Sequence, residues 1–400
     1  MRGSLHRAAL ATFALLGCDY AVWLSEDLDA GERADAAALR DAANDAAPDA
    51  DRLDADGPDA DGPDAGAQRA CERGPVPLGT ARATDPLSQP TFAVSGHLGS
   101  PRYGVLVPPA ASRIATEDTR LIIADADGAT LRERALRVTD GAGAPASTAT
   151  LHALPADGEG FLILGPTAIW LLSADGEGEP LALAVPPRAE WQRSAGWLDD
   201  DRFAFVSDAP ALPLAVLERA ARAVSATTVS AVDAACVHIE RGGVTISRAG
   251  PTTEVVVYEP ALDGAEALRS AWDDGTPLAG RLLAAATHGS ERVWIVRDAN
   301  EFRTAVTAVR VPAGSEPVPG SSITLLSPIT ASLEGTVFAI QGSGPALWTY
   351  SLELATFSPL PAPPGDALVE PERDGERLAV LGLRPDGASD LALELSCGLR

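Results

Sequence analysis

The chain has 400 residues, of which 31 are basic and 56 acidic, giving a net charge of −25. This excess of negative charge argues against a surface for nucleic acid or anionic membranes, so we expect no nucleic acid among the partners. Every basic residue is an arginine, which excludes a Schiff-base lysine and the lysine of a phosphate-binding loop.

The first eighteen residues carry the features of an export signal. Arg2 and Arg7 precede an apolar run from Ala8 to Leu16, and the segment ends on Leu-Leu-Gly-Cys at Cys18. This ending resembles the lipobox of bacterial lipoproteins, whose cysteine is acylated. The resemblance implies a signal peptide over residues 1–17, lipidation of Cys18, and an exported protein anchored to a bacterial membrane, at the periplasmic face or the cell surface.

Residues 18–70 are predicted to be a disordered linker. Between Asp19 and Ala70 there are fifteen acidic residues and four arginines, and the second half is almost entirely Asp, Ala, Pro and Gly. Such a segment cannot bury a core and should act as an extended spacer. The run from Asp54 to Asp64 resembles a calcium loop only in part, because the bidentate glutamate of an EF-hand is missing, and we interpret it as linker.

From residue 71 to 400 the chain reads as many short strands separated by Gly, Pro and Asp turns. One strand pattern recurs at intervals of 40, 42, 41, 49, 44 and 41 residues. The repeats begin at Arg120, Gly160, Arg202, Gly243, Arg292, Thr336 and Arg377. This period is the length of a four-stranded propeller blade, so we predict an all-β propeller of seven blades, with six or eight as the alternatives.

The last repeat has residues for only three strands, because its third strand ends at Leu395 and the chain stops at Arg400. We therefore expect an N-terminal strand to complete the last blade. The stretch from Pro75 to Ser95 is available, and Thr91–Ser95 is the most strand-like part of it. Cys71 and Cys397 would then lie close together and form a disulfide, with Cys236 left as a small buried thiol.

The repeats, above all Asp374-Gly-Glu-Arg-Leu-Ala-Val380, resemble those of the propeller group that includes TolB-like, quinoprotein-like and WD40-like domains. The resemblance covers nearly all of residues 71–397. It implies a fold, and it does not name a ligand, because the motif describes a turn followed by a buried strand.

The sequence contains few residues in the patterns of known catalytic motifs. Four histidines follow the signal peptide, and no two have metal-ligand spacing, so we expect neither a metal site nor a cofactor.

The densest acidic positions each follow a tryptophan: Asp199 and Asp200 after Trp197, and Asp273 and Asp274 after Trp272. Two carboxylates beside aromatic rings would suit glycan cleavage. The structural interpretation, which we favour, is that the aspartates are solvated residues of a turn and that the indole beside them is packed. A Cys-His nucleophile formed by Cys236 and His238 is a further, less favoured alternative.

We therefore predict an anchored, monomeric, non-catalytic binding or scaffold module that meets a protein, peptide or glycan at the mouth of the propeller channel. The alternative is a glycan-active hydrolase or lyase with carboxylates at the channel.

Overall fold

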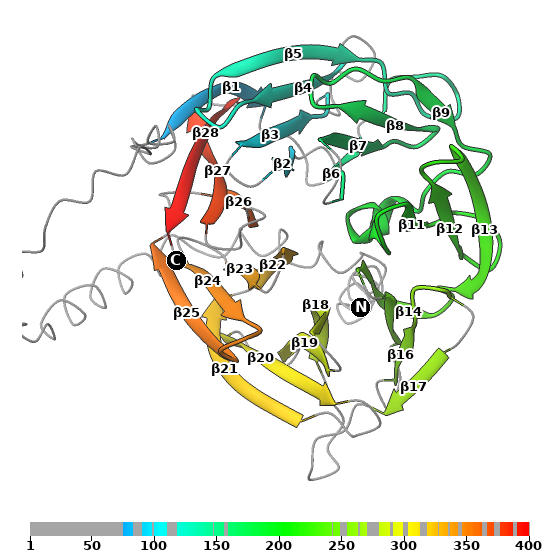
Figure 1. The fold of residues 1–400 in the computed structure, drawn as a ribbon, viewed down its shortest axis with the longest axis vertical. Helices are drawn as coiled ribbons and strands as arrows, with labels where there is room; N and C mark the ends of the chain where they lie inside the picture. Colours follow the sequence, from blue (N-terminus) through cyan, green and yellow to red (C-terminus); the bar gives the residue numbers. More distant parts are fainter. Residues whose placement is uncertain are drawn as a thin grey trace, which may run out of the picture.

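In the computed structural model the described residues are 75–82, 90–97, 100–109, 118–146, 148–155, 159–241, 243–248, 254–262, 265–269, 280–288, 291–298, 303–312, 318–326, 328–334, 337–342, 346–361, 366–371, 377–386 and 390–399. Among them are seven four-stranded antiparallel sheets. The sheets stand around a ring, with one strand of each near the ring axis and one at the rim (Figure 1). The chain is a β-propeller, and each sheet is called a blade below.

The first four blades follow the chain without a break. Each is given from the ring axis outward. Blade 1 contains β2 (Thr91–His97), β3 (Ser100–Val107), β4 (Thr119–Ala124) and β5 (Thr130–Leu136). Blade 2 contains β6 (Thr150–Ala153), β7 (Gly160–Leu164), β8 (Ala168–Ser173) and β9 (Pro180–Ala182). Blade 3 follows the 3-10 helix η5 (Ala189–Ser194) and contains β10 (Gly196–Trp197), β11 (Arg202–Val206), β12 (Pro213–Glu218) and β13 (Ala223–Ser230). Blade 4 contains β14 (Ala234–Glu240), β15 (Gly243–Arg248), β16 (Glu254–Tyr258) and β17 (Ala265–Arg269).

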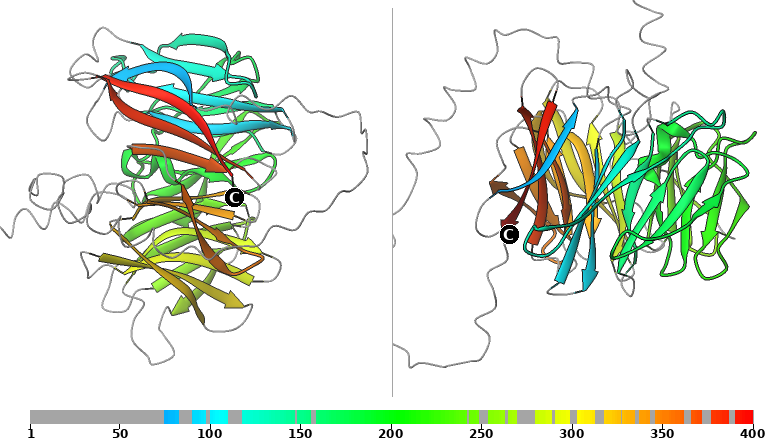
Figure 2. Two further views of the ribbon diagram at one scale, coloured as in Figure 1. Left: turned by 90° about the vertical axis from the view of Figure 1, so that its left-hand side faces the viewer. Right: turned by 90° about the horizontal axis from the view of Figure 1, so that it is seen from above.

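The last three blades include the closure of the ring. Blade 5 contains β18 (Gly280–His288), β19 (Glu291–Asp298), β20 (Arg303–Pro312) and β21 (Val318–Leu326). Blade 6 contains β22 (Pro328–Glu334), β23 (Val337–Gly342), β24 (Ala346–Ser351) and β25 (Thr356–Pro361). Blade 7 contains β26 (Asp366–Pro371), β27 (Arg377–Asp386) and β28 (Asp390–Leu399), with β1 (Val76–Arg82) as its rim strand. Seen edge-on, the strands cross the thickness of the disc (Figure 2).

The expected closure by an N-terminal strand is confirmed, but with a different strand. β1 pairs antiparallel with β28, from Val76 opposite Leu395 to Arg82 opposite Asp390. Thr91–Ser95 is instead part of β2, the innermost strand of blade 1. The misassignment has a physical cause: β1 contains a proline and a glycine at a bulge and buries only part of its length, so its apolar pattern is weaker than that of Thr91–Ser95.

The first sequence repeat is also displaced by one strand. The other six repeats coincide with the second strand of a blade, whereas Arg120 lies in β4, the third strand of blade 1. The second strand there is β3, which does not begin one of the repeats. The first interval of the series therefore does not measure the distance between equivalent strands.

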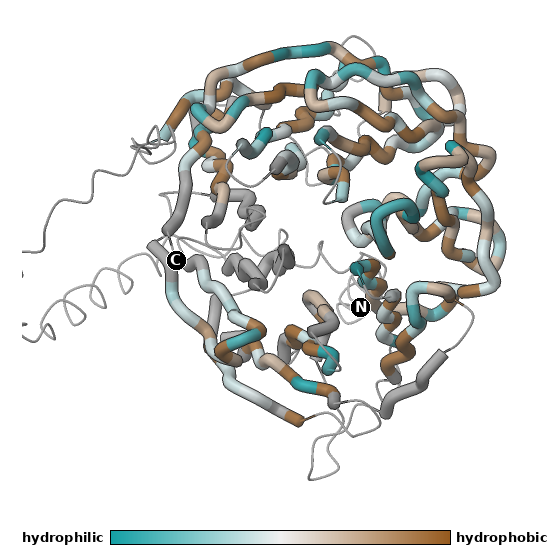
Figure 3. Tube along the Cα trace, viewed as in Figure 1, coloured by the Kyte–Doolittle hydropathy of each residue, from teal (hydrophilic) through white to brown (hydrophobic). Residues whose placement is uncertain are grey.

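The core lies between neighbouring blades. Strands in the middle of a blade are apolar on both faces, as β7 is, because each face packs against another blade. Between blades 7 and 1, Tyr103 and Ile122 pack in one cluster with Leu381 and Leu395, all at most 1% exposed. Between blades 2 and 3, Leu162 and Phe203 belong to a cluster of the same kind. The hydropathy view shows these middle strands in brown (Figure 3).

Aspartate side chains stabilise hairpin turns of the blades. In the turn after β4, the Asp125 carboxylate accepts hydrogen bonds from the backbone N–H groups of Asp127 and Ala129, each at 2.9 Å. Gly128 has φ +74°, a conformation that favours glycine. The turn at Asp125-Ala-Asp-Gly therefore joins β4 to β5 as a hairpin. In the described residues no helix is long and apolar enough to cross a membrane.

Candidate functional site

Two turns that follow innermost strands carry charged groups that could form a site. The turn between β10 and β11 holds Asp199, Asp200 and Asp201, and the turn after β14 follows Glu240. Both turns join an innermost strand to the second strand of its blade, so they lie beside the ring axis in blades 3 and 4 (Figure 1). We call these two turns the mouth turns.

Asp199 organises its own turn. Its Oδ1 accepts hydrogen bonds from the backbone N–H of Asp201 at 2.9 Å and of Arg202 at 2.8 Å, and its Oδ2 accepts one from Arg202 Nε at 2.7 Å. Partial burial alone would raise the pKa of the Asp199 carboxyl, but the Arg202 side chain and the two backbone N–H groups outweigh it and lower the pKa. Asp199 therefore stays ionised and is held as a turn cap.

Asp200 and Asp201 are used in the same way. Asp200 forms an ion pair with Arg241 of the neighbouring mouth turn, which joins blades 3 and 4. The Asp201 carboxylate accepts a hydrogen bond from the backbone N–H of Ala220 at 2.7 Å, in the turn between β12 and β13. These described aspartates of the turn thus have structural partners.

Trp197 is half-buried and bonds to the neighbouring blade. Its Nε1 donates a hydrogen bond to the carbonyl oxygen of Ala153 in blade 2 at 2.7 Å. Its ring meets Phe203 edge-on, with 5.2 Å between the centroids. The indole is packed between blades 2 and 3, which agrees with the structural interpretation of the Trp-Asp pattern at this position.

Glu240 is a half-buried residue that the sequence did not single out. Its Oε2 atom is buried and has no hydrogen-bond partner. Burial raises the pKa of Glu240 well above its ordinary value, and the positive charge of Arg292 offsets part of the rise. Arg292 is itself in an ion pair with Glu259, at 2.6 Å. The available signal was the alternation of Cys236, His238 and Glu240, which places the three residues on one face of β14.

The two histidines with described side chains hydrogen-bond to structural groups. His152 Nε2 lies 3.0 Å from Thr150 Oγ1, and the ring meets Phe203 edge-on. Burial lowers the pKa of His152 to about 4, so the imidazole is neutral at physiological pH. His238 Nε2 donates to the carbonyl oxygen of Leu282 in blade 5 at 3.0 Å. Among the described side chains, no three His, Cys, Asp or Glu residues gather in a way that could hold a metal ion.

Cys236 is buried, as expected, and its Sγ lies 3.1 Å from the Leu282 carbonyl oxygen and 3.6 Å from His238 Nε2. It is disulfide-bonded and its bonding partner lies outside the described side chains, so the expectation of a free thiol at this position was wrong. A disulfide sulfur cannot act as a nucleophilic thiolate, which removes the Cys-His alternative for this state of the protein.

Several predicted positions lie outside the described part of the chain. They are Trp272, Asp273 and Asp274, the signal peptide, Cys18, the linker and Cys71, together with the side chain of Cys397. The strand that holds Cys397 is described, and there Cys397 lies opposite Ala379 of β27. The Cys71–Cys397 disulfide stays a prediction.

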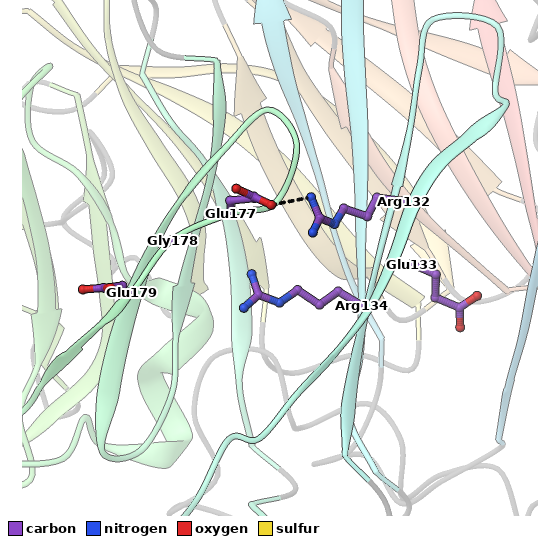
Figure 4. Close-up of a pocket in the computed structure, with 6 residues that line it drawn as sticks. All are labelled: Arg132, Glu133, Arg134, Glu177, Gly178 and Glu179. Carbon is purple, nitrogen blue, oxygen red and sulfur yellow. Dashed lines mark hydrogen bonds and ion pairs between the residues drawn. The ribbon is translucent and has the colours of Figure 1, made fainter.

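A shallow groove of about 420 Å³ lies at the rim between blades 1 and 2 (Figure 4). It is lined by Arg132, Glu133, Arg134, Glu177, Gly178 and Glu179. Arg132 forms an ion pair with Glu177 at 2.9 Å, and Arg134 donates to the carbonyl oxygen of Gly176 at the same distance. These contacts join the rim strand of blade 1 to the last turn of blade 2, so the groove is a solvated seam between blades.

No family description matches the chain, and no curated protein matches it. Solved structures similar to it include the Pan2 WD40 domain of Neurospora crassa, with 10% identity, a TM-score of 0.49, and coverage of 80% of this chain and 95% of that one. An oligogalacturonate lyase in complex with manganese has 10% identity and a TM-score of 0.48, covering 82% and 98%. BamB from Moraxella catarrhalis has 10% identity and a TM-score of 0.40, covering 80% and 96%. At these identities the likeness concerns the fold alone.

Proposed function

We propose that the protein is a lipid-anchored, exported β-propeller that acts as a non-catalytic binding or scaffold module for a protein, peptide or glycan. One observation carries the proposal: the described aspartates of the mouth turns, and Trp197 beside them, are engaged in capping a turn or joining two elements. Asp199 caps its turn, Asp200 pairs with Arg241, and Trp197 donates to blade 2. Side chains held in this way support a rigid surface rather than proton transfer.

The binding part of the proposal is tested by affinity measurements on the mouth turns. The full chain is immobilised and screened against arrays of bacterial-envelope glycans and of peptides. Ligands that bind the wild type but bind at least about tenfold more weakly to Asp200→Arg, which reverses a charge at the mouth, would support a binding surface there. Arg132→Ala, a charge change at the rim groove, is the matched control. Ligands that are cleaved instead of retained would reject the non-catalytic assignment.

The anchoring part rests on the signal-like N-terminus. In an expressing bacterium, the wild type is expected to incorporate radiolabelled palmitate and to partition into the detergent phase, because acyl chains dominate its partitioning. Cys18→Ser should abolish both. Labelling that persists in Cys18→Ser would show that the lipid is attached elsewhere, and a wild type without label would reject the anchor.

A glycan-active hydrolase or lyase is the second candidate, and Glu240 is the observation that favours it. Among the described carboxyl groups, Glu240 is one whose pKa is raised by burial, the property of a general acid. Glycosidases need a second carboxylate within reach, and the aspartates nearest in the mouth turns are already bonded. The candidate predicts release of reducing or unsaturated ends from a polysaccharide panel, lost in Glu240→Gln. No release by the wild type rejects it.

A further inference from the structure

The rim of the propeller is a ring of sheet edges. The rim strands in the described residues are β1, β5, β9, β13, β17, β21 and β25, one for each blade. A rim strand has one side paired within its blade and presents unpaired backbone N–H and C=O groups on the other side. Unless the strand is guarded, this edge can pair with another extended chain.

Six of these described rim strands carry a guard that discourages such pairing. Charged residues lie in β5, at Arg132 to Arg134, and in β17, at Glu266 and Arg269. Prolines interrupt β1, β21 and β25, at Pro77, Pro319, Pro359 and Pro361. β9 has only three residues and begins with Pro180. Charge, proline and short length are the means by which natural sheets protect their edges.

β13 carries none of these guards. Its eight residues, Ala-Val-Ser-Ala-Thr-Thr-Val-Ser, include no charged residue, no proline and no glycine. Figure 3 shows the contrast, since β5 carries teal segments and β13 does not. Its register with β12 is regular over Ala223–Ala226, and a bulge follows before Ser230. Ala223, Ser225 and Ala226 are exposed.

We infer that the Ala223–Ala226 edge of β13 is a docking site for an extended peptide segment of a partner protein, which pairs with it as an added strand. We choose this occupant because the edge presents a row of backbone N–H and C=O groups. Only another extended backbone offers acceptors and donors at the same spacing. The neighbouring rim strand β9 is short, so blade 2 does not extend alongside the full length of β13. A second copy of the chain is disfavoured, since each copy has a net charge of −25.

The inference rests on the proposed binding function and places the contact on the rim strand of blade 3 rather than on the mouth turns. The test is selection of a phage-displayed library of random dodecapeptides on the immobilised full chain. The selected peptides are then examined by hydrogen–deuterium exchange and by affinity measurement. We expect slower exchange for the amides of residues 223–226 when peptide is bound, because their free edge becomes hydrogen-bonded.

Ala226→Lys places a charge on the unguarded edge and should weaken peptide binding about tenfold or more. The matched control is Ala135→Lys, which changes an exposed alanine on the already charged strand β5 and should leave affinity within about twofold. Equal unfolding midpoints of the two variants show that each folds. Peptides bound equally well by Ala226→Lys would overturn the inference.

Two further outcomes separate this inference from the proposed function. Peptides that lose affinity in Asp200→Arg but not in Ala226→Lys would reject the rim site while leaving a binding module. Absence of any selected peptide would reject the rim site, with the glycan arrays still testing the function. A dimer seen in sedimentation that Ala226→Lys dissolves would show that a second copy occupies the edge and would overturn the peptide assignment.

Discussion

Polar side chains of the innermost strands bond repeatedly to the backbone of the next blade. Thr91 Oγ1 accepts from the N–H of Leu151, Trp197 donates to Ala153, and His238 donates to Leu282. Each bond crosses from one blade to its neighbour, and each satisfies a backbone group near the ring axis. Residues that sequence alone offers as catalytic candidates are therefore used to hold blades together.

The neutral imidazole of His152 predicts a loss of stability in acid. Its pKa is about 4 in the folded protein against 6.5 in the unfolded chain, so the unfolded state binds more protons between those values. Stability contributed by His152 is complete above pH 6.5 and is lost as pH falls toward 4, by at most about 3 kcal/mol. Urea unfolding of the wild type and His152→Gln over this range measures it. Parallel pH curves for the two proteins would contradict the assignment.

The turn cap of Asp199 and the ion pair of Asp200 should differ in their contribution to stability. Asp199→Ala removes three hydrogen bonds and should lower the free energy of unfolding by about 1 to 3 kcal/mol. Asp200→Ala removes an exposed ion pair and should cost less than about 1 kcal/mol. Denaturant unfolding at pH 7 distinguishes them. A larger loss in Asp200→Ala than in Asp199→Ala would reverse our ranking.

At the scale of the element, sequence predicted middle strands better than rim strands. A strand such as β7 or β11 is apolar along its length because blades cover both faces, and this pattern is local to a few residues. The closing strand β1 has no such pattern, because its assignment depends on β28 at the other end of the chain. The hydrogen-bond partner of Trp197 and the ion-pair partner of Asp200 could not be predicted from the sequence either, because each partner lies about one blade away along the chain.

The closing strand should be required for a stable ring. A chain that begins at residue 83 lacks β1, which buries Leu78 and Ala81 against the blade 7 core and pairs with β28. We expect it to lose roughly 3 to 5 kcal/mol of stability relative to a chain that begins at residue 75. Thermal unfolding compares the two. The shorter chain unfolding at the same midpoint would show that β1 is dispensable.

At the scale of the whole molecule, the remaining prediction concerns the seam between β1 and β28. Val76 lies opposite Leu395, two residues from Cys397, and Cys71 precedes Val76 by five residues. A disulfide between Cys71 and Cys397 would contribute roughly 4 to 5 kcal/mol by loop-closure arithmetic. Because Cys236 is also disulfide-bonded, this pairing would leave Cys18 as the partner of Cys236, so this pairing and the lipidation of Cys18 are alternatives. Mass spectrometry of a non-reducing digest should find the linked peptides, and Cys71→Ser should lower the unfolding midpoint. Recovery of a peptide that links Cys71 to Cys236 would replace this pairing.

The β1–β28 pairing also fixes an order of events during biosynthesis. Of the described strands, β1 is made first and β28 last, so β1 has no sheet partner until β28 has been made. Blades 1 to 6 can form from local contacts, whereas the final step joins residues more than three hundred positions apart, which is slow. Until that step, one end of the chain offers an unpaired strand and the other an unpaired edge. The newly made protein therefore passes through a period of exposure to misfolding that ends only when β28 pairs with β1.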